Sequence, residues 1–527
     1  MRKRRNRIIS LLCAAVMLAG AAVIPAEATE AIEYTTLAEV PMIEGTLPVW
    51  EDGDVVGFIG DSITHAEYCA ISYVEVLYDY YLSHYPEKEV EFRNLGVACF
   101  KASHILDIYH RDQAFEGINK AVIMLGMNEA LRKDTLETYI TNMEKIISLL
   151  KEDGLTGEDI IVLSPTPYDE TCNANFDSKG NMLKACNGAL TEFTRALSVK
   201  TQEWGVYFLD LHTPMQKITE EIQKESKNRT LTDWDCIHPD ALGQQLMAYY
   251  ILQAQGADPV ISEISISEEG EDRTKEVEVT NLYRGEGGLC WDAKFETLPM
   301  AITPEWLDFN EQLFDLTEAL CQTPLQIEGL ETETSYHILM GGSLLGTFSG
   351  QELAEGINLA ELETNPLEAA IQQAELVNRD WHLKSANYRR IVRYSTMAVP
   401  THTEAQRQEA YDLWVEEDAP LRNMMYAIVQ EAVEKTYRMV VVEEGYSIEK
   451  LEKQAERAAR EKQKETENLE DEAEEKPEQE SGGFWKSFFK EVLIVIGAAA
   501  GVFVLVLGAA VVISKIRRRR KRGRRRK

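Results

Sequence analysis

Over residues 48–256, short runs of mostly apolar residues alternate with segments of helical periodicity. The apolar runs are nearly continuous, as expected for strands that are buried on both faces of a parallel sheet. These runs cover residues 55–59, 90–93, 121–125, 160–163 and 206–209. Helical periodicity between and after them predicts helices near 68–84, 135–151, 183–204 and 241–252. The alternation predicts a three-layer α/β/α domain with a parallel sheet, whose ligands bind beyond the carboxyl ends of the strands.

The pattern changes after this domain. Residues 259–357 hold short alternating or apolar segments separated by Gly- and Glu-rich turns, which predicts a small β-sandwich. Apolar residues then recur every three to four positions, which predicts a helical region over 360–442. The highly charged residues 443–490 predict a stalk, either helical or disordered. Within the stalk, the spacing of Ile448, Leu451 and Ala455 is a short pattern of the coiled-coil type.

Both ends of the chain carry membrane-targeting patterns. A basic start, an apolar run and the small-x-small site Ala26-Glu27-Ala28 predict a signal peptide over 1–28, with an uncleaved signal anchor as the alternative. Residues 492–513 contain no charged side chain, and as a transmembrane helix they would span about 33 Å, enough to cross a bilayer. The basic segment 514–527 follows directly, which predicts a cytoplasmic tail. We therefore expect a single-pass protein of the cell membrane with an extracellular body.

Charge and cysteine content narrow the possible partners. The 527-residue chain has a formal net charge of −33 although both ends are basic. So acidic a body argues against nucleic acid as a partner, because phosphate binding needs a basic face. Cys172 with Cys186, and Cys290 with Cys321, are close enough in sequence to be candidate disulfides, but the spacing leaves the connectivity open. The commonest zinc and redox motifs do not occur, so we expect no metal and no cofactor.

Polar residues with catalytic potential follow the predicted strands. Gly60-Asp61-Ser62 ends the first strand, where a strand-to-helix turn can expose a serine hydroxyl. Asp235-Cys236-Ile237-His238 follows the fifth strand and supplies a histidine base with a carboxylate three residues before it. Gly96 follows the second strand and Asn128 the third. Because the carboxyl ends of parallel strands meet at one edge of the sheet, we expect these residues to converge.

Each of these features also has a simpler explanation. A Gly-Asp-Ser tripeptide is most often an ordinary turn, and His238 could merely cap the helix that follows it. Other candidate bases are weaker, since His65 lies too close to Ser62 along the chain to reach its hydroxyl comfortably. His212 is better explained by local hydrogen bonds at the end of the fifth strand. The order of the motifs, each after a strand, favours the catalytic interpretation.

With these motifs in this order, somewhat under half of the chain resembles the SGNH, or GDSL-type, family of serine esterases and lipases. The resemblance implies a flavodoxin-like hydrolase fold in which Ser62 is the nucleophile, His238 the base and Asp235 the residue that orients the base. It also implies an oxyanion hole formed by the N–H groups of Ser62 and Gly96 and by the Asn128 side chain. The residue after Asn128 is glutamate where the family pattern has aspartate, which leaves the geometry of this loop open.

The expected activity is hydrolysis of carboxylic esters outside the cell. O-acyl or O-acetyl groups on carbohydrates are the first expected substrates, and short-chain lipid esters are the second. Two alternatives stay open: an acyltransferase that acts on a surface polymer, and a surface binding or scaffold protein that has lost activity. The β-domain is expected to be a spacer or a packing partner rather than a carbohydrate-binding module.

Overall fold

The computed structural model describes residues 47–67, 69, 71–225, 229–269, 271–300 and 316–474. The predicted signal peptide, the segment 492–513, the basic tail 514–527 and the end of the stalk lie outside these described residues. Among the helices of the described ranges, none is long and apolar enough to cross a membrane.

The first sheet has five parallel strands in the order β2-β1-β3-β4-β5. The strands are β1 (Val55–Gly60), β2 (Glu91–Asn94), β3 (Lys120–Met124), β4 (Ile160–Leu163) and β5 (Tyr207–Leu209). Each coincides with one of the apolar runs, so the predicted parallel sheet is confirmed. The order is that of a flavodoxin-like fold, and it reverses at β1, between β2 and β3. Ligands of such sheets bind at the carboxyl ends of the strands next to this reversal.

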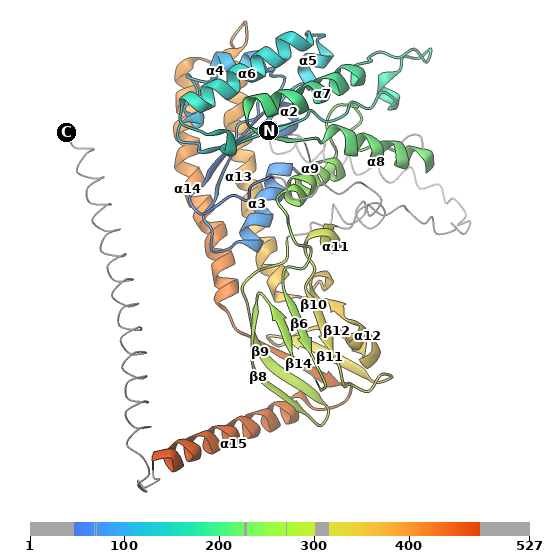
Figure 1. The fold of residues 1–527 in the computed structure, drawn as a ribbon, viewed down its shortest axis with the longest axis vertical. Helices are drawn as coiled ribbons and strands as arrows, with labels where there is room; N and C mark the ends of the chain where they lie inside the picture. The colour runs from blue at the N-terminus through green and yellow to red at the C-terminus, as the bar shows by residue number, and fades with distance from the viewer. Residues whose placement is uncertain are drawn as a thin grey trace, which may run out of the picture. The chain divides into compact units, whose positions relative to one another are not determined.

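Helices cover both faces of the sheet (Figure 1). On one face, α3 (Tyr73–His84) packs against α9 (Ala241–Ala254), and on the other α6 (Leu136–Glu152) packs against α7 (Asn187–Trp204). The other helices of the domain are α2 (Ser62–His65), α4 (Ala102–Ile108), α5 (Met127–Leu131) and α8 (His212–Glu225). The three-layer arrangement therefore agrees with the sequence prediction.

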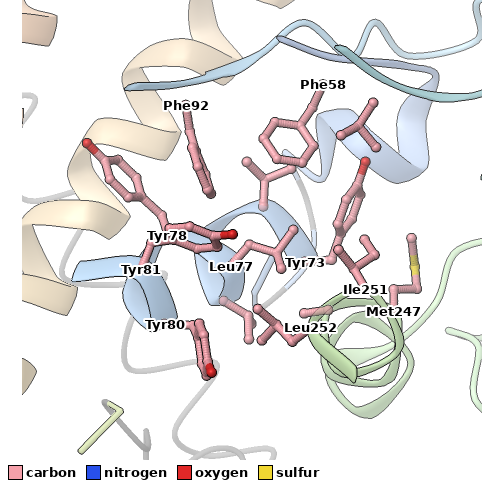
Figure 2. Packing of buried hydrophobic residues seen from close by; sticks show 14 of the residues in the cluster. Phe58, Tyr73, Leu77, Tyr78, Tyr80, Tyr81, Phe92, Met247, Ile251 and Leu252 are labelled. Carbon is pink, nitrogen blue, oxygen red and sulfur yellow. The ribbon is translucent and has the colours of Figure 1, made fainter. Parts of the chain in front are cut away.

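An aromatic cluster joins the sheet to α3 (Figure 2). The Phe58 ring of β1 lies 5.9 Å from Tyr73, and the Phe92 ring of β2 lies 5.0 Å from Tyr78, measured between ring centroids. Trp381, from a helix far along the chain, meets Tyr78 edge-on at 5.2 Å. Aromatic pairs of this kind contribute about 0.5–1.5 kcal/mol each beyond the area that they bury. The cluster thus holds α3, and a helix from the C-terminal half of the chain, against the sheet.

Two further sheets form the β-domain. The four-stranded sheet has the order β13-β10-β6-β7, and the five-stranded sheet has the order β12-β11-β14-β9-β8. Their strands are β6 (Glu263–Ile266), β7 (Arg273–Lys275), β8 (Val277–Gly285), β9 (Gly288–Phe295), β10 (Pro324–Ile327), β11 (Ser335–Met340), β12 (Ser343–Ser349), β13 (Ile357–Asn358) and β14 (Tyr437–Glu443). Two short helices, α11 (Leu316–Leu320) and α12 (Gly350–Glu355), accompany them. Buried side chains of both sheets belong to one continuous hydrophobic core, as a sandwich requires.

The helical region predicted over 360–442 ends earlier in the structure. It consists of α13 (Pro366–Thr396) and α14 (Glu404–Glu434), which pack against each other. The chain then returns to the β-domain as β14, which pairs with β11 on one side and β9 on the other. The β-branched run of residues 440–442 favours an extended strand. The prediction missed this strand because its sheet partners lie far away in the sequence.

Helix α13 packs against the hydrolase domain and shares its core. Asn378 donates through Nδ2 to Asp79 Oδ1 on α3 at 2.8 Å. The buried Arg389 guanidinium pairs with Asp112 Oδ2 at 2.5 Å and donates to Leu95 O at 3.0 Å. The helical pattern alone indicated no role for this region, whereas in the structure it supports the loops around the sheet edge.

Helix α15 (Ile448–Glu474) forms the part of the predicted stalk that the structure describes. Its residues Leu451 and Ala455 are buried against Cys290 and Val440 of the five-stranded sheet. The apolar spacing that resembled a coiled coil therefore packs these turns of the helix on the β-domain.

Candidate active site

Ser62 is the first residue of α2, directly after β1 ends. Asp61 caps this helix, since its Oδ1 accepts from the Ile63 N–H at 2.9 Å. The turn is tight, because a Cβ atom at Gly60 would lie 2.1 Å from Thr64 Oγ1 and 3.0 Å from a backbone oxygen. Ser62 is half-buried, and its N–H group has no acceptor among the described residues. The turn thus presents a hydroxyl and an unused N–H together at the carboxyl edge of the sheet.

His238 lies in the loop before α9 and reaches the same edge. Its Nε2 atom is 2.8 Å from Ser62 Oγ, and its Nδ1 atom is 2.5 Å from Asp235 Oδ2. Asp235 Oδ1 accepts from the N–H groups of Ile237 and His238 at 2.9 and 3.1 Å. The structure therefore brings together the serine, the histidine and the aspartate that the sequence singled out. A hydroxyl, an imidazole and a carboxylate in this chain are the parts of a serine nucleophile and its base.

The pKa shifts of His238 and Asp235 agree with this geometry. Burial favours the neutral form of His238, but the hydrogen bond to Asp235 and its negative charge outweigh burial and raise the pKa of His238 above 6.5. Burial also disfavours a charged Asp235, yet the hydrogen bonds from His238 and from the backbone lower the pKa of Asp235 to about 2. Asp235 is thus an anion at neutral pH. It holds the Nδ1–H of His238, so that Nε2 faces the serine as the acceptor.

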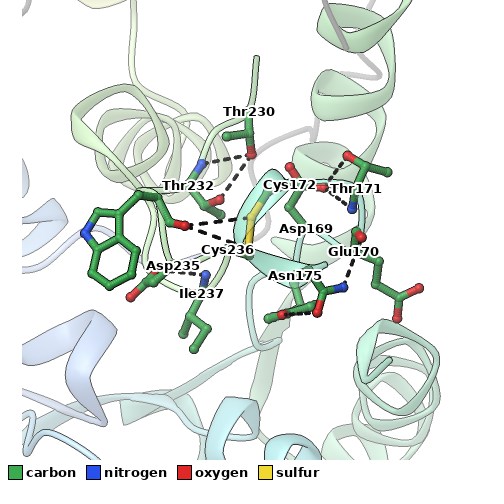
Figure 3. Close-up of a disulfide and its surroundings, with 12 residues drawn as sticks. Asp169, Glu170, Thr171, Cys172, Asn175, Thr230, Thr232, Asp235, Cys236 and Ile237 are labelled. Carbon is green, nitrogen blue, oxygen red and sulfur yellow. Dashed lines mark hydrogen bonds between the residues drawn. A yellow bond between two sulfur atoms is a disulfide. The ribbon is translucent and has the colours of Figure 1, made fainter. Parts of the chain in front are cut away.

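A disulfide anchors the loop that carries the aspartate and the histidine (Figure 3). Cys236, between Asp235 and His238 in the chain, is bonded to Cys172 in the segment after β4. Cys236 has a φ of +67°, a left-handed conformation that residues other than glycine rarely adopt. The bridge therefore ties a strained turn of the candidate active site to a neighbouring segment.

Both candidate disulfides of the sequence analysis are wrong. Cys186 is a buried thiol in the structure, because Cys172 bonds to Cys236 instead. Cys290 is also a thiol, so the bridge from it to Cys321 is not formed. The prediction failed because a bridge depends on the distance between Cα atoms, which spacing along the chain does not give.

Asn128 is in α5, directly after β3, and faces the serine turn. Its Nδ2 donates to Asp61 Oδ2 at 3.2 Å, which leaves its second N–H available for another acceptor. The next residue, Glu129, is buried, and its Oε1 accepts from the Ala102 N–H at 2.6 Å. Burial raises the pKa of Glu129 to about 7. The glutamate that departs from the family pattern thus connects α5 to the start of α4.

Gly96 contributes to the site in a different way from the one expected. Its N–H donates to Asn94 Oδ1 at 3.0 Å, so this group is engaged within the loop. A Cβ atom at Gly96 would lie 2.4 Å from the His65 backbone nitrogen, behind the Ser62 turn. In this structure Gly96 therefore allows close packing of two loops, and Ser62 N–H and the Asn128 amide are the available donors.

The other histidines near this edge contact groups from distant parts of the chain instead of the serine. His65 is buried, and its Nε2 lies 2.9 Å from the carbonyl oxygen of Ala386 on α13. Burial lowers the pKa of His65 to about 4, so it is neutral at physiological pH. His212 Nε2 lies 3.1 Å from Asn187 Oδ1.

Two features beside the site were missed in the sequence. Trp234 directly precedes the aspartate of the loop and is 84% exposed. The sequence could have indicated this residue, because Trp234 directly precedes the Asp-Cys-Ile-His motif. The second feature is Arg390 of α13, which pairs with Glu67, just beyond the serine helix, at 2.7 Å. No local pattern could have indicated that pair, because more than 300 residues separate its members.

A flavodoxin-like sheet with a serine, a histidine and an aspartate in contact at the strand-order reversal is the arrangement of an SGNH-type hydrolase. Residues 58–246 match the GDSL-like lipase/acylhydrolase family. This match covers most of the hydrolase domain, and the chain is an ester-bond hydrolase.

Several solved structures are similar to this chain at low sequence identity. BT4096, a gut microbial diltiazem-metabolizing enzyme, is 20% identical with a TM-score of 0.65, and the match covers 76% of this chain and 99% of that chain. The acetylxylan esterase Axe2 from Geobacillus stearothermophilus is 19% identical with a TM-score of 0.32, over 40% of this chain and 96% of that chain. No curated protein matched the sequence. The first likeness shows a fold shared over more of the chain than the hydrolase domain alone.

Proposed function

We propose that this chain is a serine esterase in which Ser62 is the nucleophile, His238 the general base and Asp235 the residue that orients the base. The observation that carries the proposal is the continuous hydrogen-bonded path from Ser62 Oγ through both nitrogens of His238 to the Asp235 carboxylate. Such a path lets the imidazole accept the serine proton as the hydroxyl attacks.

The reaction proceeds by two acyl transfers. Ser62 Oγ attacks the ester carbonyl, and His238 Nε2 accepts its proton. The tetrahedral anion is stabilised by the Ser62 N–H and the Asn128 amide, and it collapses as His238 returns the proton to the departing alcohol. Water then attacks the acyl-enzyme with the same histidine as base, which releases the carboxylic acid and restores the serine.

We infer that catalysis takes place outside the cell, on a body anchored by residues 492–513 with the tail 514–527 in the cytoplasm. The signal-peptide pattern of residues 1–28 supports this location. The disulfide in the loop that carries Asp235 and His238, the catalytic loop, also supports an extracellular location, because such bonds persist in oxidising compartments.

The proposed substrates are O-acetyl or other O-acyl groups on carbohydrates, with short-chain lipid esters second. The exposed indole of Trp234 supports the first choice. It presents a broad apolar face with a polar edge beside the catalytic loop, against which the apolar face of a sugar ring can pack.

The catalytic assignment is tested with 4-nitrophenyl acetate and a labelled fluorophosphonate. Ser62→Ala should lower the hydrolysis rate by about 10⁴–10⁶-fold and abolish labelling, because the nucleophile is lost. Ser148→Ala, which removes an exposed hydroxyl on α6, should behave as the wild type. Equal hydrolysis by the wild type and Ser62→Ala would refute the assignment, and absent labelling of the wild type would favour a scaffold protein.

The substrate is tested by comparing acetylated xylan with short-chain triglycerides. Acetate release from xylan at the higher kcat/KM supports a carbohydrate esterase. Preferential cleavage of the triglyceride supports a lipid esterase, and transfer of labelled acetyl groups to an added polymer instead of water supports an acyltransferase.

A further inference from the structure

A cavity of about 670 Å³ lies next to the candidate active site and has no role in the reaction described above. The loop that follows Gly96 forms one wall through Ala98 and Cys99, and α4 forms a second. The remaining walls come from Arg132, at the end of α5, and from the C-terminal end of α13 with Arg393. Segments from both halves of the chain therefore build it.

The lining of this cavity is cationic, although the protein as a whole is strongly acidic. Arg111, Arg132 and Arg393 contribute guanidinium groups, against one carboxylate, that of Asp107. Arg111 forms an ion pair at 3.6 Å with Glu404, which does not line the cavity. Positive charge gathered in a hollow of an acidic surface marks a place where an anion is favoured.

Two of these arginines are held by neutral atoms and form no ion pair within the described part of the chain. Arg132 donates through Nη2 to the carbonyl oxygen of Cys99 at 3.1 Å, and Arg393 donates through Nη2 to Cys99 Sγ at 3.2 Å. Each guanidinium carries five N–H donors, so most of its donors and its charge stay available. Two guanidiniums positioned by one residue suit a planar or tetrahedral oxyanion, which accepts several hydrogen bonds at once.

A histidine, His104, also lines the cavity. Its pKa is lowered by burial and then by the positive charges of Arg132 and Lys101. His104 is thus neutral at physiological pH and adds no charge of its own.

The cavity is close to the proposed oxyanion donors. The backbone N–H of Arg132 donates to the carbonyl oxygen of Asn128 at 3.1 Å, so Arg132 follows Asn128 by about one helical turn, or about 6 Å along the helix. Cys99 is three residues after Gly96, whose backbone packs behind the Ser62 turn. A substrate whose ester carbonyl sits between Ser62 and Asn128 can therefore extend a neighbouring group into the cavity.

We propose that this cavity is a subsite for an anionic group, a carboxylate or a phosphate, on the ester substrate, bound by Arg132 and Arg393. The proposal deepens the proposed esterase function and rests on it. The preferred substrate is then an ester of an acidic molecule, such as an acetylated uronic acid, rather than of a neutral sugar.

Binding is tested first, on the full-length chain, with three probes that share one ring: D-galacturonate, D-galactose 6-phosphate and D-galactose. We expect one or both anions to bind at least tenfold more tightly than galactose. Arg132→Gln and Arg393→Gln should each weaken anion binding about tenfold. The control Arg195→Gln removes the positive charge of an exposed side chain on α7 and should change nothing. Equal binding of all three probes, or equal loss in the control, would overturn the subsite.

Hydrolysis of the acetylated forms of the same three compounds provides the second readout. Each arginine variant should raise KM for the anionic esters about tenfold, while kcat/KM for acetylated galactose stays within twofold. Equal losses on anionic and neutral esters would overturn the subsite in favour of a structural role for the arginines. Arginine-dependent anion binding without hydrolysis of any ester would instead refute the proposed function and retain the anion site.

Discussion

At the scale of single residues, the Asp235 carboxylate organises the catalytic loop. It accepts from the imidazole of His238 and from the N–H groups of Ile237 and His238. Charge-assisted hydrogen bonds of this kind stabilise the anion, which is why the pKa of Asp235 falls to about 2 despite burial. The same bonds orient the imidazole before any substrate arrives.

The pH dependence of hydrolysis should report this interaction. The base must be neutral, so kcat/KM should fall as the pH drops through the pKa of His238, which lies above 6.5. Asp235→Asn removes the negative charge that raises this pKa. The acid limb should therefore move to lower pH, while kcat falls by about 10³–10⁴-fold because an amide no longer selects the tautomer that carries its proton on Nδ1. Initial rates between pH 4 and about 9 measure both effects.

Asp233→Asn is the matched control for this experiment. Asp233 is in the same loop, and its charge is only a minor influence on the pKa of His238. The acid limb should shift slightly and kcat should stay near the wild-type value. An acid limb that is unchanged in Asp235→Asn would contradict the assigned role of the aspartate.

At the scale of elements, the disulfide joins the catalytic loop to the segment after β4. Its two cysteines are 64 residues apart, and closing a loop of that length stabilises a fold by about 4 kcal/mol. Cys172→Ser should lower the free energy of unfolding by about this amount. It should also lower kcat, because Cys236 lies between the aspartate and the histidine. Thermal unfolding and 4-nitrophenyl acetate kinetics measure the two effects.

Cys186→Ser separates the bridge from the general effect of replacing a buried thiol. It should cost some stability but leave kcat unchanged, and added reductant should lower its activity as it does that of the wild type. The activity of Cys172→Ser should not change when reductant is added. Full wild-type activity in the presence of reductant would show that the bridge does not position the loop.

Helix α13 also contacts the loops around the sheet edge. Arg389 and Asp112 form a buried ion pair with almost no exposed side-chain surface, and Tyr388 also donates to this carboxylate. Arg389→Met should lower the free energy of unfolding by about 3–5 kcal/mol, because it leaves a buried carboxylate without its counter-charge. Urea-induced unfolding of residues 29–474 measures the loss.

The next residue of the helix is the control for that substitution. Arg390 pairs with Glu67 at 2.7 Å, but its side chain is 40% exposed. Arg390→Met should therefore cost no more than about 1 kcal/mol. Similar losses in both variants would contradict the difference in burial as the cause.

At the scale of the whole molecule, the hydrolase domain, the β-domain and the helix pair formed by α13 and α14 are interleaved. The chain leaves the β-domain after β13, packs α13 against the hydrolase domain, and returns as β14 to the centre of the five-stranded sheet. The described residues up to Ala455 cluster as one compact unit. The accessory parts therefore contribute to the stability of the enzyme.

Truncation tests this dependence. A chain that ends at residue 360 lacks the central strand of one sheet and exposes the aromatic surface of α3 that Trp381 covers. It should aggregate, or unfold at least about 10 °C below the wild type, since several kilocalories per mole of packing are lost. A chain that ends at residue 474 keeps these contacts and should unfold in one cooperative transition. Equal melting temperatures and kcat for both truncations would contradict the interleaved core.

The sequence by itself was enough to predict the parallel sheet and the three central residues of the site. Continuous apolar runs report strands buried on both faces, and Ser62 directly follows such a strand. Asp235 and His238 lie beyond α8, and they were found from their spacing of three residues and from the order of the motifs along the chain.

Only the tertiary structure decided which groups from distant segments meet there. The partner of Cys236, the engagement of the Gly96 N–H by Asn94, the return of β14 and the approach of Arg393 to the cavity all depend on long-range packing. Hydrophobic periodicity reports which face of an element is buried, but not what covers it. Ester chemistry was thus readable from the sequence, whereas the cationic subsite beside it required the folded chain.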